Sequence, residues 1–347
     1  MKNREQFVGC MVGGATGDAL GFLIEADSLD EIHAKYGPFG LRTVLKLDAN
    51  NRRGIISDDT QMALFTADGL LWADHDKLSP KIGLFHSYMR WYYTQTERVA
   101  RPEFKDWMGR QPHESFWQYD IMAEKELYNR RSPSMTSMKA LSLGRLCGQD
   151  IKVNNSKSCA SVMRAAPVGM FYAGDAERAF HVGCQSAGLT HGNPTGCYAA
   201  GAMAAMVSLI LVGTPMAKVL PQVMKLLRKE KGSKEVVKVL HKGVEEAGKD
   251  HDPLKSLEKI GAGWVAEEAL AAAVFCLLKT DSFKNAVIMA CNHDGDSDSC
   301  GAVCGNLAGA VYGADAVPKN WSHNLECGSL LTKIADCLYE GNETLKQ

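Results

Sequence analysis

The chain has 347 residues, of which 46% are hydrophobic and 23% are charged, and its formal net charge is −1. This composition is typical of a globular protein with a large apolar core. Surfaces that bind the phosphate backbone of nucleic acids are usually basic, so the near-neutral charge argues against a nucleic-acid partner. The eleven cysteines form no CxxC pair, and we expect reduced, buried thiols in a cytoplasmic protein.

Helical periodicity dominates the chain. Apolar residues recur at spacings of three and four over residues 60–73, 80–93, 177–187, 198–211, 216–227, 234–247, 265–278 and 283–291. Residues 41–47 are the only candidate strand, and we expect a loop there. Residues 197–212 are strongly apolar but shorter than the roughly 20 residues of a membrane span, which predicts a buried core helix and no membrane partner. No Pro/Gly/Ser-rich linker divides the chain, so we expect one compact, multi-helix, all-α domain over residues 1–347.

Two series of glycines recur every four residues. They comprise Gly9, Gly13, Gly17 and Gly21, and then Gly301, Gly305, Gly309 and Gly313. A glycine inside a helix costs about 1 kcal/mol relative to alanine. Two such series therefore indicate bare helix faces that another backbone approaches closely. We expect both helices to be buried at the centre and to hold the acidic segments described next in register. The alternative is that some of these glycines mark turns.

Carboxylates and hydroxyls are concentrated in two short segments, residues 57–60 (SDDT) and residues 294–299 (DGDSDS). Crowded carboxylates repel one another and need a compensating cation or exposure to water. If the fold joins the segments, they form an oxygen-ligand site for two divalent cations. The ligands would be Ser57, Asp58, Asp59, Asp296, Asp298 and Ser299. Oxygen ligands suit Mg²⁺ or Mn²⁺ better than zinc, and we expect His293 to support the site without binding metal.

Two other motifs fit the second acidic segment poorly. A calcium EF-hand loop requires Gly and Glu where this chain has Ser299 and Gly305. An aspartyl-phosphate phosphatase motif requires a parallel α/β sheet after it, whereas only about fifty residues, mostly helical in pattern, remain.

Six short motifs follow one another along the chain in a recognisable order. They are residues 13–21 (GGATGDALG), Glu25, residues 57–60 (SDDT), residues 163–167 (MRAAP), residues 190–194 (THGNP) and residues 295–299 (GDSDS). In this order they resemble the ADP-ribosylglycohydrolase family, over nearly the whole chain. The resemblance implies an all-α fold, two bound Mg²⁺ or Mn²⁺ ions, and removal of ADP-ribose from modified protein side chains or small acceptors.

The resemblance also implies roles for particular residues. The six residues named above would hold the metals. Glu25, Asp58 and Asp298 would be catalytic, with Glu25 near the scissile bond as an acid or a substrate-positioning group. The implied substrate-binding residues are Ser158, Cys159, Ser161, Met163, Arg164 and His191. We expect Asp18, which lies inside the first glycine series, to have a structural role because a buried carboxylate needs partners.

The chain departs from the family pattern in residues 156–161 (SKSCAS), where the phosphate-binding loop is usually glycine-rich. Side chains there limit how closely backbone amides approach an anion. The leading interpretation is a metal-dependent hydrolase that removes ADP-ribose from arginine. One alternative is a hydrolase of serine-linked or O-acetyl-linked ADP-ribose. The other is a binding protein that neutralises a partner, an ADP-ribosyltransferase toxin, by occlusion.

Overall fold

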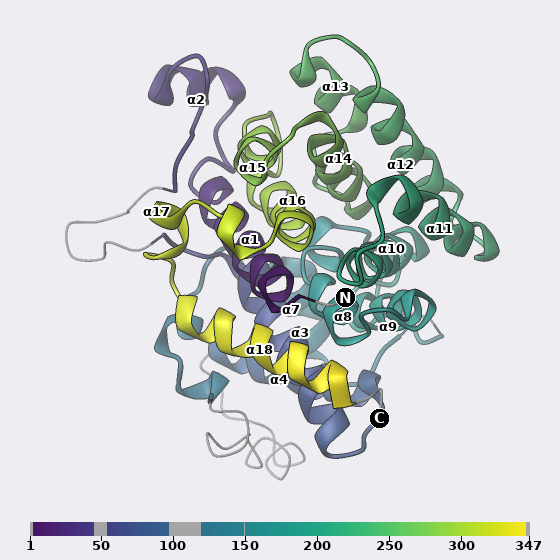
Figure 1. Ribbon diagram of the computed structural model, residues 1–347. Helices are drawn as coiled ribbons and strands as arrows, with labels where there is room; N and C mark the ends of the chain where they lie inside the picture. The colour runs from purple at the N-terminus through teal and green to yellow at the C-terminus, as the bar shows by residue number, and fades with distance from the viewer. Residues whose placement is uncertain (1–2, 45–53, 97–118, 149, 345–347) are drawn as a thin grey trace.

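The computed structural model describes residues 3–44, 54–96, 119–148 and 150–344, and its regular structure is helical (Figure 1). Within these ranges there is no β-strand, and only two isolated bridges pair extended residues. The predicted all-α class is therefore confirmed. Residues 41–44 are neither helix nor strand, and the rest of the 41–47 segment lies outside the described residues.

The predicted helices are present, with small shifts at their ends. They are α3 (Asp58–His75), α4 (Pro80–Thr96), α9 (Ala176–Gly188), α10 (Pro194–Ile210), α11 (Met216–Lys229), α12 (Lys234–Ala247), α14 (Ala266–Lys279) and α15 (Phe283–Cys291). The glycine series belong to α1 (Arg4–Gly21) and α16 (Ser297–Tyr312). Further helices are α2 (Leu29–Tyr36), α7 (Met135–Ser142), α8 (Ala166–Phe171), α13 (Pro253–Ile260), α17 (Lys319–Ser322) and α18 (Gly328–Thr344).

Helices α1 and α16 pack against each other through their glycine faces, in opposite directions. A Cβ atom added at Gly9 would lie 2.5 Å from the carbonyl oxygen of Gly309, and one at Gly13 would lie 2.5 Å from that of Gly305. Both helices are buried over most of their length. The predicted close packing is thus confirmed. Gly313 instead follows the end of α16 with φ of 80°, so this glycine marks a turn as the alternative proposed.

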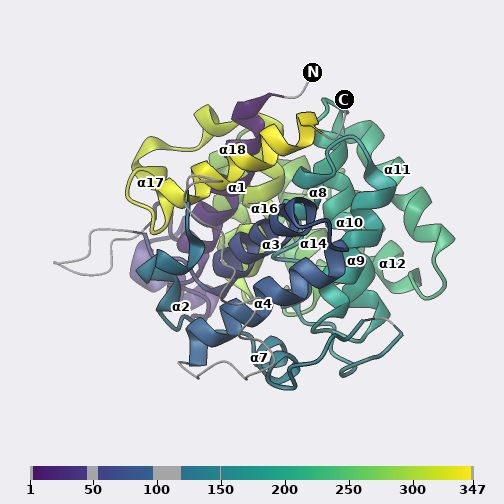
Figure 2. The same cartoon turned by 90° about the horizontal axis from the view of Figure 1, so that it is seen from below.

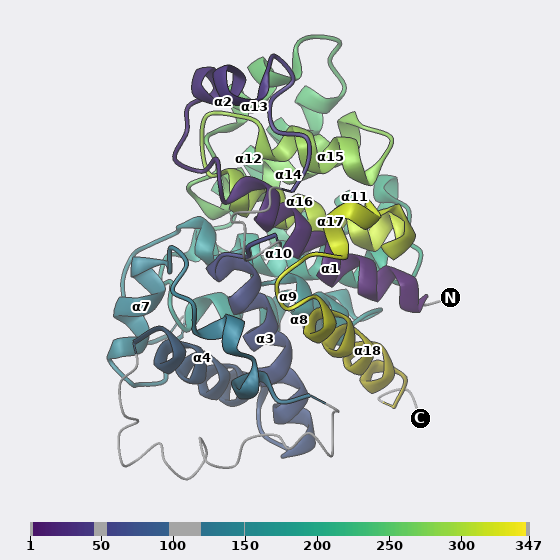
Figure 3. The same ribbon diagram turned by 90° about the vertical axis from the view of Figure 1, so that its left-hand side faces the viewer.

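The α1–α16 pair lies at the centre of the molecule. Helices α14 and α15 pack against α16 on one side, whereas α3 and α18 pack against α1 on the other (Figure 3). Helix α10 lies among α8, α9 and α14 (Figure 2), and it is buried along nearly all its length. The apolar segment 197–212 is therefore part of a core helix, as predicted. Among the described helices, none combines the length and hydropathy needed to cross a membrane.

Replacing Gly305 with alanine tests the close packing of α1 and α16. We expect G305A to lower the free energy of unfolding by about 1–3 kcal/mol, the usual cost of forcing extra volume into a packed interior. Gly341 is a matched control, because a Cβ added to this α18 glycine would lie 3.9 Å from its nearest neighbour. G341A should be neutral or slightly stabilising. Denaturant unfolding of both variants would contradict the packing argument if their midpoints were equal.

Candidate active site

Both acidic segments begin helices. Ser57 is the N-cap of α3, and its hydroxyl accepts a hydrogen bond from Asp59 N at 3.1 Å. Asp296 is the N-cap of α16, and its carboxylate accepts one from Ser299 N at 3.2 Å. Helix N-termini expose unpaired amides and a partial positive charge, which favour such side chains. Helix capping therefore explains Ser57 and Asp296, but it does not explain the other carboxylates of the two acidic segments.

Asp18 of α1 connects the start of α3 to the glycine helices. Its buried carboxylate accepts hydrogen bonds from Ser57 N at 3.1 and 3.0 Å and from Thr60 N at 3.1 Å. The hydroxyl of Thr60 donates a further hydrogen bond at 2.5 Å. These contacts agree with the expected structural role. Because the end of α1 lies beside the start of α16, they bring the two acidic segments together.

The joined segments line a cavity of about 240 Å³. Five carboxyl groups contribute to its wall: Glu25, Asp58, Asp59, Asp296 and Asp298. One oxygen atom each from Glu25, Asp296 and Asp298 lies within 4.8 Å of the other two. Of the six predicted metal ligands, all but Ser57 are among the described residues that line the cavity.

Burial raises the pKa values of four of these carboxyl groups, those of Glu25, Asp58, Asp59 and Asp298, and the charges of neighbouring carboxylates add to the effect. The pKa of Asp58 rises to about 8, mainly through burial, although a hydrogen bond from Ser134 N opposes the rise. Burial, followed by the charges of Asp296 and Asp18, raises the pKa of Glu25 to about 7. The pKa values of Asp59 and Asp298 are also well above the usual range because of burial and neighbouring carboxylates.

A divalent cation would relieve this arrangement. The Oδ2 atom of Asp59 is buried, and it has no hydrogen-bond partner among the described residues. An unpartnered buried carboxylate oxygen is costly unless a cation compensates it. The donor set consists mainly of carboxylate and hydroxyl oxygens, which hard divalent cations prefer. The residues present thus fit a metal centre formed by both segments.

Another part of the cavity wall comes from the serine loop, defined here as residues 156–161. Ser158, Cys159 and Met163, which were predicted to bind substrate, line the cavity beside the carboxylates. Cys159 N donates a hydrogen bond to Trp264 O at 3.1 Å, and Ala266 N donates one to Lys157 O at 2.9 Å. Residues 264–266 therefore hold the serine loop in place.

The other three predicted substrate-binding residues lie behind the cavity wall. Arg164 is fully buried, with its guanidinium 2.5 Å from the hydroxyl of Thr190. Thr190 in turn bonds His191 Nδ1 at 2.8 Å, and His191 Nε2 bonds the Ser158 hydroxyl at 2.7 Å. Burial, followed by the charge of Arg164, holds the pKa of His191 well below its usual value. This chain of contacts orients Ser158.

Ser161 is also buried, and its hydroxyl donates to Ser158 O at 2.9 Å. Neither Ser161, Arg164 nor His191 is among the described residues that line the cavity. The structure thus gives these three side chains contacts that support the serine loop.

Some cavity residues had no recognisable signal in the sequence. Trp264 lies at the cavity with 49% of its surface exposed, and Ser134 supplies the backbone amide that binds Asp58. Both come from segments between the motifs, and only the paired glycines around residue 262 hint at a turn. His293 is buried beside the site, whereas the exposed Asp294 accepts a hydrogen bond from Leu29 N at 2.7 Å. The Asp294 carboxylate therefore stabilises the first residue of α2.

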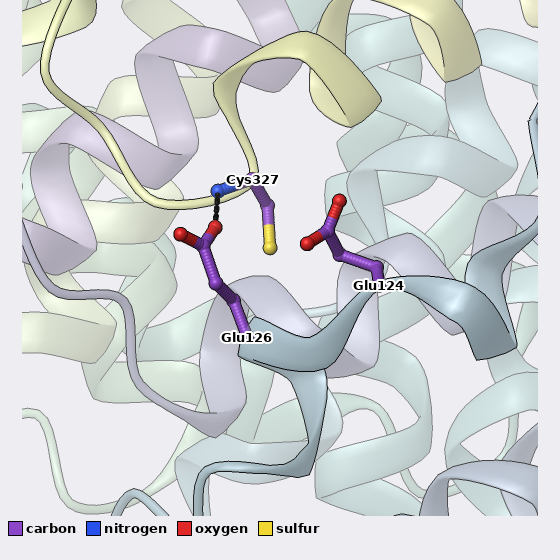
Figure 4. A group of neighbouring side chains, drawn as sticks. All are labelled: Glu124, Glu126 and Cys327. Atoms are coloured by element: carbon purple, nitrogen blue, oxygen red, sulfur yellow. Dashed lines mark hydrogen bonds between the residues drawn. The ribbon is translucent and has the colours of Figure 1, made fainter.

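A second group of metal-ligating side chains lies away from this cavity. Figure 4 shows Glu124 and Glu126, which flank the start of the short 3₁₀ helix η3 (Lys125–Tyr128), on either side of the Cys327 thiol. Cys327 N donates a hydrogen bond to Glu126 Oε2 at 2.6 Å. Since Cys327 immediately precedes α18, Glu126 fixes the point where that helix begins.

Comparisons with known proteins agree with the fold. The family model described as ADP-ribosylglycohydrolase matches residues 1–347. An ADP-ribosylarginine hydrolase, Tri1, of Serratia proteamaculans is 24% identical over 336 residues, covering 95% of this chain and 78% of that protein. The ADP-ribosyl-[dinitrogen reductase] glycohydrolase of Rhodospirillum rubrum is 47% identical over 47 residues, 14% of this chain and 16% of that one.

A solved structure described as an ADP-ribosylglycohydrolase-related protein complex has the same fold, with a TM-score of 0.67. It is 22% identical, and the match covers 98% of both chains. The match of the family model over residues 1–347 shows that this chain belongs to the ADP-ribosylglycohydrolase family. It is therefore an enzyme of the glycosidase type, a hydrolase that removes ADP-ribose, and the predicted family is confirmed.

The raised carboxyl pKa values predict an unusual pH dependence of stability without metal. Glu25 and Asp58, with pKa values of about 7 and 8, keep protons in the folded state that the unfolded chain has lost above about pH 4.5. The free energy of unfolding should therefore fall as pH rises, by up to about 1.4 kcal/mol per pH unit for each such carboxyl group. The pKa of His191 is depressed in the folded state, so below pH 6.5 the unfolded chain binds a proton there that the folded chain does not. This difference makes the free energy of unfolding rise with pH, so the fall caused by the carboxyl groups should be clearest between pH 6.5 and 8.

Denaturant unfolding in a chelator over this pH range measures the effect. Saturating Mg²⁺ or Mn²⁺ should reduce the fall by removing the contribution of Asp58, since the ions favour the ionised form of the carboxylates that bind them. A stability that stays constant or rises from pH 6.5 to 8 in chelator would contradict the carboxyl assignment.

Proposed function

We propose that this protein is a divalent-cation-dependent hydrolase that cleaves the N-glycosidic bond between ADP-ribose and an arginine side chain. The observation that carries this proposal is the cavity in which five carboxyl groups from three parts of the chain converge. The similarity to an ADP-ribosylarginine hydrolase over 95% of the chain supports the linkage. The family match over residues 1–347 supports treating the whole chain as one functional domain.

The cations, Mg²⁺ or Mn²⁺, would be held by the two acidic segments. The proposed ligands remain Ser57, Asp58, Asp59, Asp296, Asp298 and Ser299, with the unpartnered Oδ2 of Asp59 as the strongest single indication. Bound divalent ions orient ribose hydroxyls and lower the pKa of a water molecule. Asp18 and Ser134 would keep the ligands in position through the hydrogen bonds described above.

Glu25 is the proposed proton carrier. It lies just after α1, it is partly buried at the cavity wall, and its pKa of about 7 lets its carboxyl group hold a proton near neutral pH. Cleavage at the anomeric carbon passes through an oxocarbenium-like state and requires a proton for the leaving group. A carboxyl group whose pKa is close to the working pH is well suited to give that proton and take it back.

The charge of the cavity favours a cationic acceptor. The described residues that line it include five carboxyl groups and no lysine, arginine or histidine. A guanidinium group remains positively charged at all physiological pH values, and it also stacks favourably on aromatic faces such as that of Trp264. These features support arginine over serine or an O-acetyl group as the acceptor. A reducing compartment such as the cytoplasm is proposed because most of the eleven cysteines are buried thiols and none forms a disulfide bond.

Replacing one proposed metal ligand tests the function. We expect Asp296→Asn to reduce release of ADP-ribose from arginine-modified peptide by at least about a hundredfold, the upper end of the loss caused by residues that merely orient metal ligands. Asp294→Asn is the matched control, because it lies two residues away, is exposed and keeps the oxygen that binds Leu29 N. Chelator should abolish the activity of the wild type. Activity that resists both chelator and Asp296→Asn would exclude a metal-dependent mechanism.

A comparison of substrates separates the remaining alternatives. Purified protein should release ADP-ribose faster from arginine-modified than from serine-modified peptides or O-acetyl-ADP-ribose, and a reversed order would assign the linkage to serine or acetate. Neutralisation of a transferase toxin by occlusion has no supporting observation in the contacts described above. If it occurred, it would survive Asp58→Ala, whereas hydrolysis would not.

A further inference from the structure

Arg164 is a cation buried behind the serine loop, and the proposed catalytic groups do not include it. None of its surface is exposed, and its guanidinium lies 4.6 Å from the centre of the Tyr88 ring. Among the described residues, it donates hydrogen bonds to neutral oxygens, those of the Ser137 hydroxyl at 3.4 Å, Ser186 O at 3.2 Å and the Thr190 hydroxyl at 2.5 Å. A charge buried among neutral groups is costly, and it polarises the hydrogen bonds that it joins.

The contact with Arg164 fixes the direction of the next hydrogen bond. A guanidinium can only donate, so Thr190 Oγ1 accepts from Arg164 and has one proton of its own to give. Two acceptors lie within reach of that proton, His191 Nδ1 at 2.8 Å and Ala187 O at 3.5 Å. The shorter contact is the stronger one, and the positive charge of Arg164 favours a lone pair on the nitrogen that faces it. Thr190 therefore donates to His191 Nδ1.

This hydrogen bond defines the tautomer of His191. The ring is fully buried, and burial, followed by the charge of Arg164, holds its pKa well below the usual value, which keeps it neutral. A neutral imidazole carries one proton. Because Nδ1 accepts a hydrogen bond, that proton lies on Nε2, and Nε2 donates it to the Ser158 hydroxyl at 2.7 Å.

The Ser158 hydroxyl consequently keeps its own proton for the cavity. Its oxygen accepts from His191, and the structure gives it no second partner among the described residues. Ser158 lines the 240 Å³ cavity, whose described wall contains no lysine, arginine or histidine. The hydroxyl is therefore an oriented neutral donor in a cavity that lacks cationic side chains.

We infer that Arg164, Thr190 and His191 are positioning residues that keep the Ser158 hydroxyl a hydrogen-bond donor toward an oxygen of bound ADP-ribose. This inference rests on the proposed function, which supplies the ligand. Phosphate oxygens of ADP-ribose can only accept, and hydrogen bonds to charged oxygens are about twice as strong as neutral ones. With the other His191 tautomer, Ser158 would donate to Nε2, and its proton would be lost to the ligand.

The tautomer of His191 can be measured directly. Nitrogen-15 NMR distinguishes a ring protonated on Nε2 from one protonated on Nδ1, and the signal is assigned by its absence from His191→Asn. We expect wild-type His191 to be neutral and protonated on Nε2 at neutral pH. A ring protonated on Nδ1, or on both nitrogens, would overturn the inference without any binding measurement.

Calorimetry with ADP-ribose, in saturating Mn²⁺, tests the effect on binding. Ser158→Ala should weaken the affinity about tenfold or more, the usual loss for a hydrogen bond to a charged group. Thr190→Val should weaken it several-fold, because part of the molecules then adopt the other tautomer. Thr190→Ser keeps the hydroxyl and should bind as the wild type does. In the Ser158→Ala background, Thr190→Val should have no further effect, because Thr190 acts only through Ser158.

Thr94→Val is the matched control, because Thr94 is also buried and its hydroxyl donates to Trp91 O at 2.7 Å within α4. It should leave the affinity for ADP-ribose unchanged. The inference is overturned if Ser158→Ala binds as the wild type does, or if Thr190→Val costs the same with and without the Ser158 hydroxyl. If Thr190→Val does not fold, Ser158→Ala and the wild-type tautomer decide. Failure of the wild type to bind ADP-ribose would instead contradict the proposed function, and the tautomer would still test the hydrogen-bond chain.

Discussion

The close antiparallel contact between α1 and α16 is the constraint on which the rest of the structure depends. Glycine carbonyls and Cα atoms meet where any side chain would clash, so the two helices have essentially one register. That register places the end of α1, with Asp18 and with Glu25 just beyond it, beside the start of α16, with Asp296 and Asp298. The glycines weaken both helices locally. In return, two segments from opposite ends of the chain are held together with little freedom.

The electrostatics of the site follow from that geometry. Asp18 binds the first turn of α3, so the Asp58–Asp59 pair is added to the carboxylates already at the α1–α16 junction. Burial then makes the charged forms costly, which is why the pKa values of Glu25 and Asp58 rise to about 7 and 8. Strongly perturbed carboxyl groups in a cavity are typical of functional sites. The same burial that makes the ionised carboxylates costly fits the proposed role of these groups in binding cations.

The serine loop shows how the fold compensates for unusual residues. Where close approach of a backbone to an anion usually requires glycine, this chain has side chains, and hydrogen bonds and ion pairs fix several of them. Ser158 bonds His191, whose own orientation depends on Thr190 and the buried Arg164. Lys157 reaches Glu235 at 2.7 Å and also pairs with the buried Glu267. Hydrogen bonds and ion pairs therefore hold the loop in place without glycine, and one of its residues, Cys159, lines the cavity together with the proposed metal ligands.

The sequence by itself determined the helical class, most of the long helices although not α18, and the two acidic segments, because hydrophobic periodicity and helix N-terminal residues are local properties. It also predicted the glycine packing, since glycines four residues apart lie on one face of a helix and leave that face open to a second backbone. Short helices such as α2 were missed, even though Ser28 and Glu31 form a capping box, because eight residues carry too little periodicity.

Only the tertiary structure decided which predicted residues reach the cavity. Arg164 and His191 were predicted to bind substrate together with Ser158, yet they lie behind it, whereas Trp264 and Ser134 come from segments without any motif. Such contacts join residues far apart in the chain, so their positions depend on packing that no local pattern records.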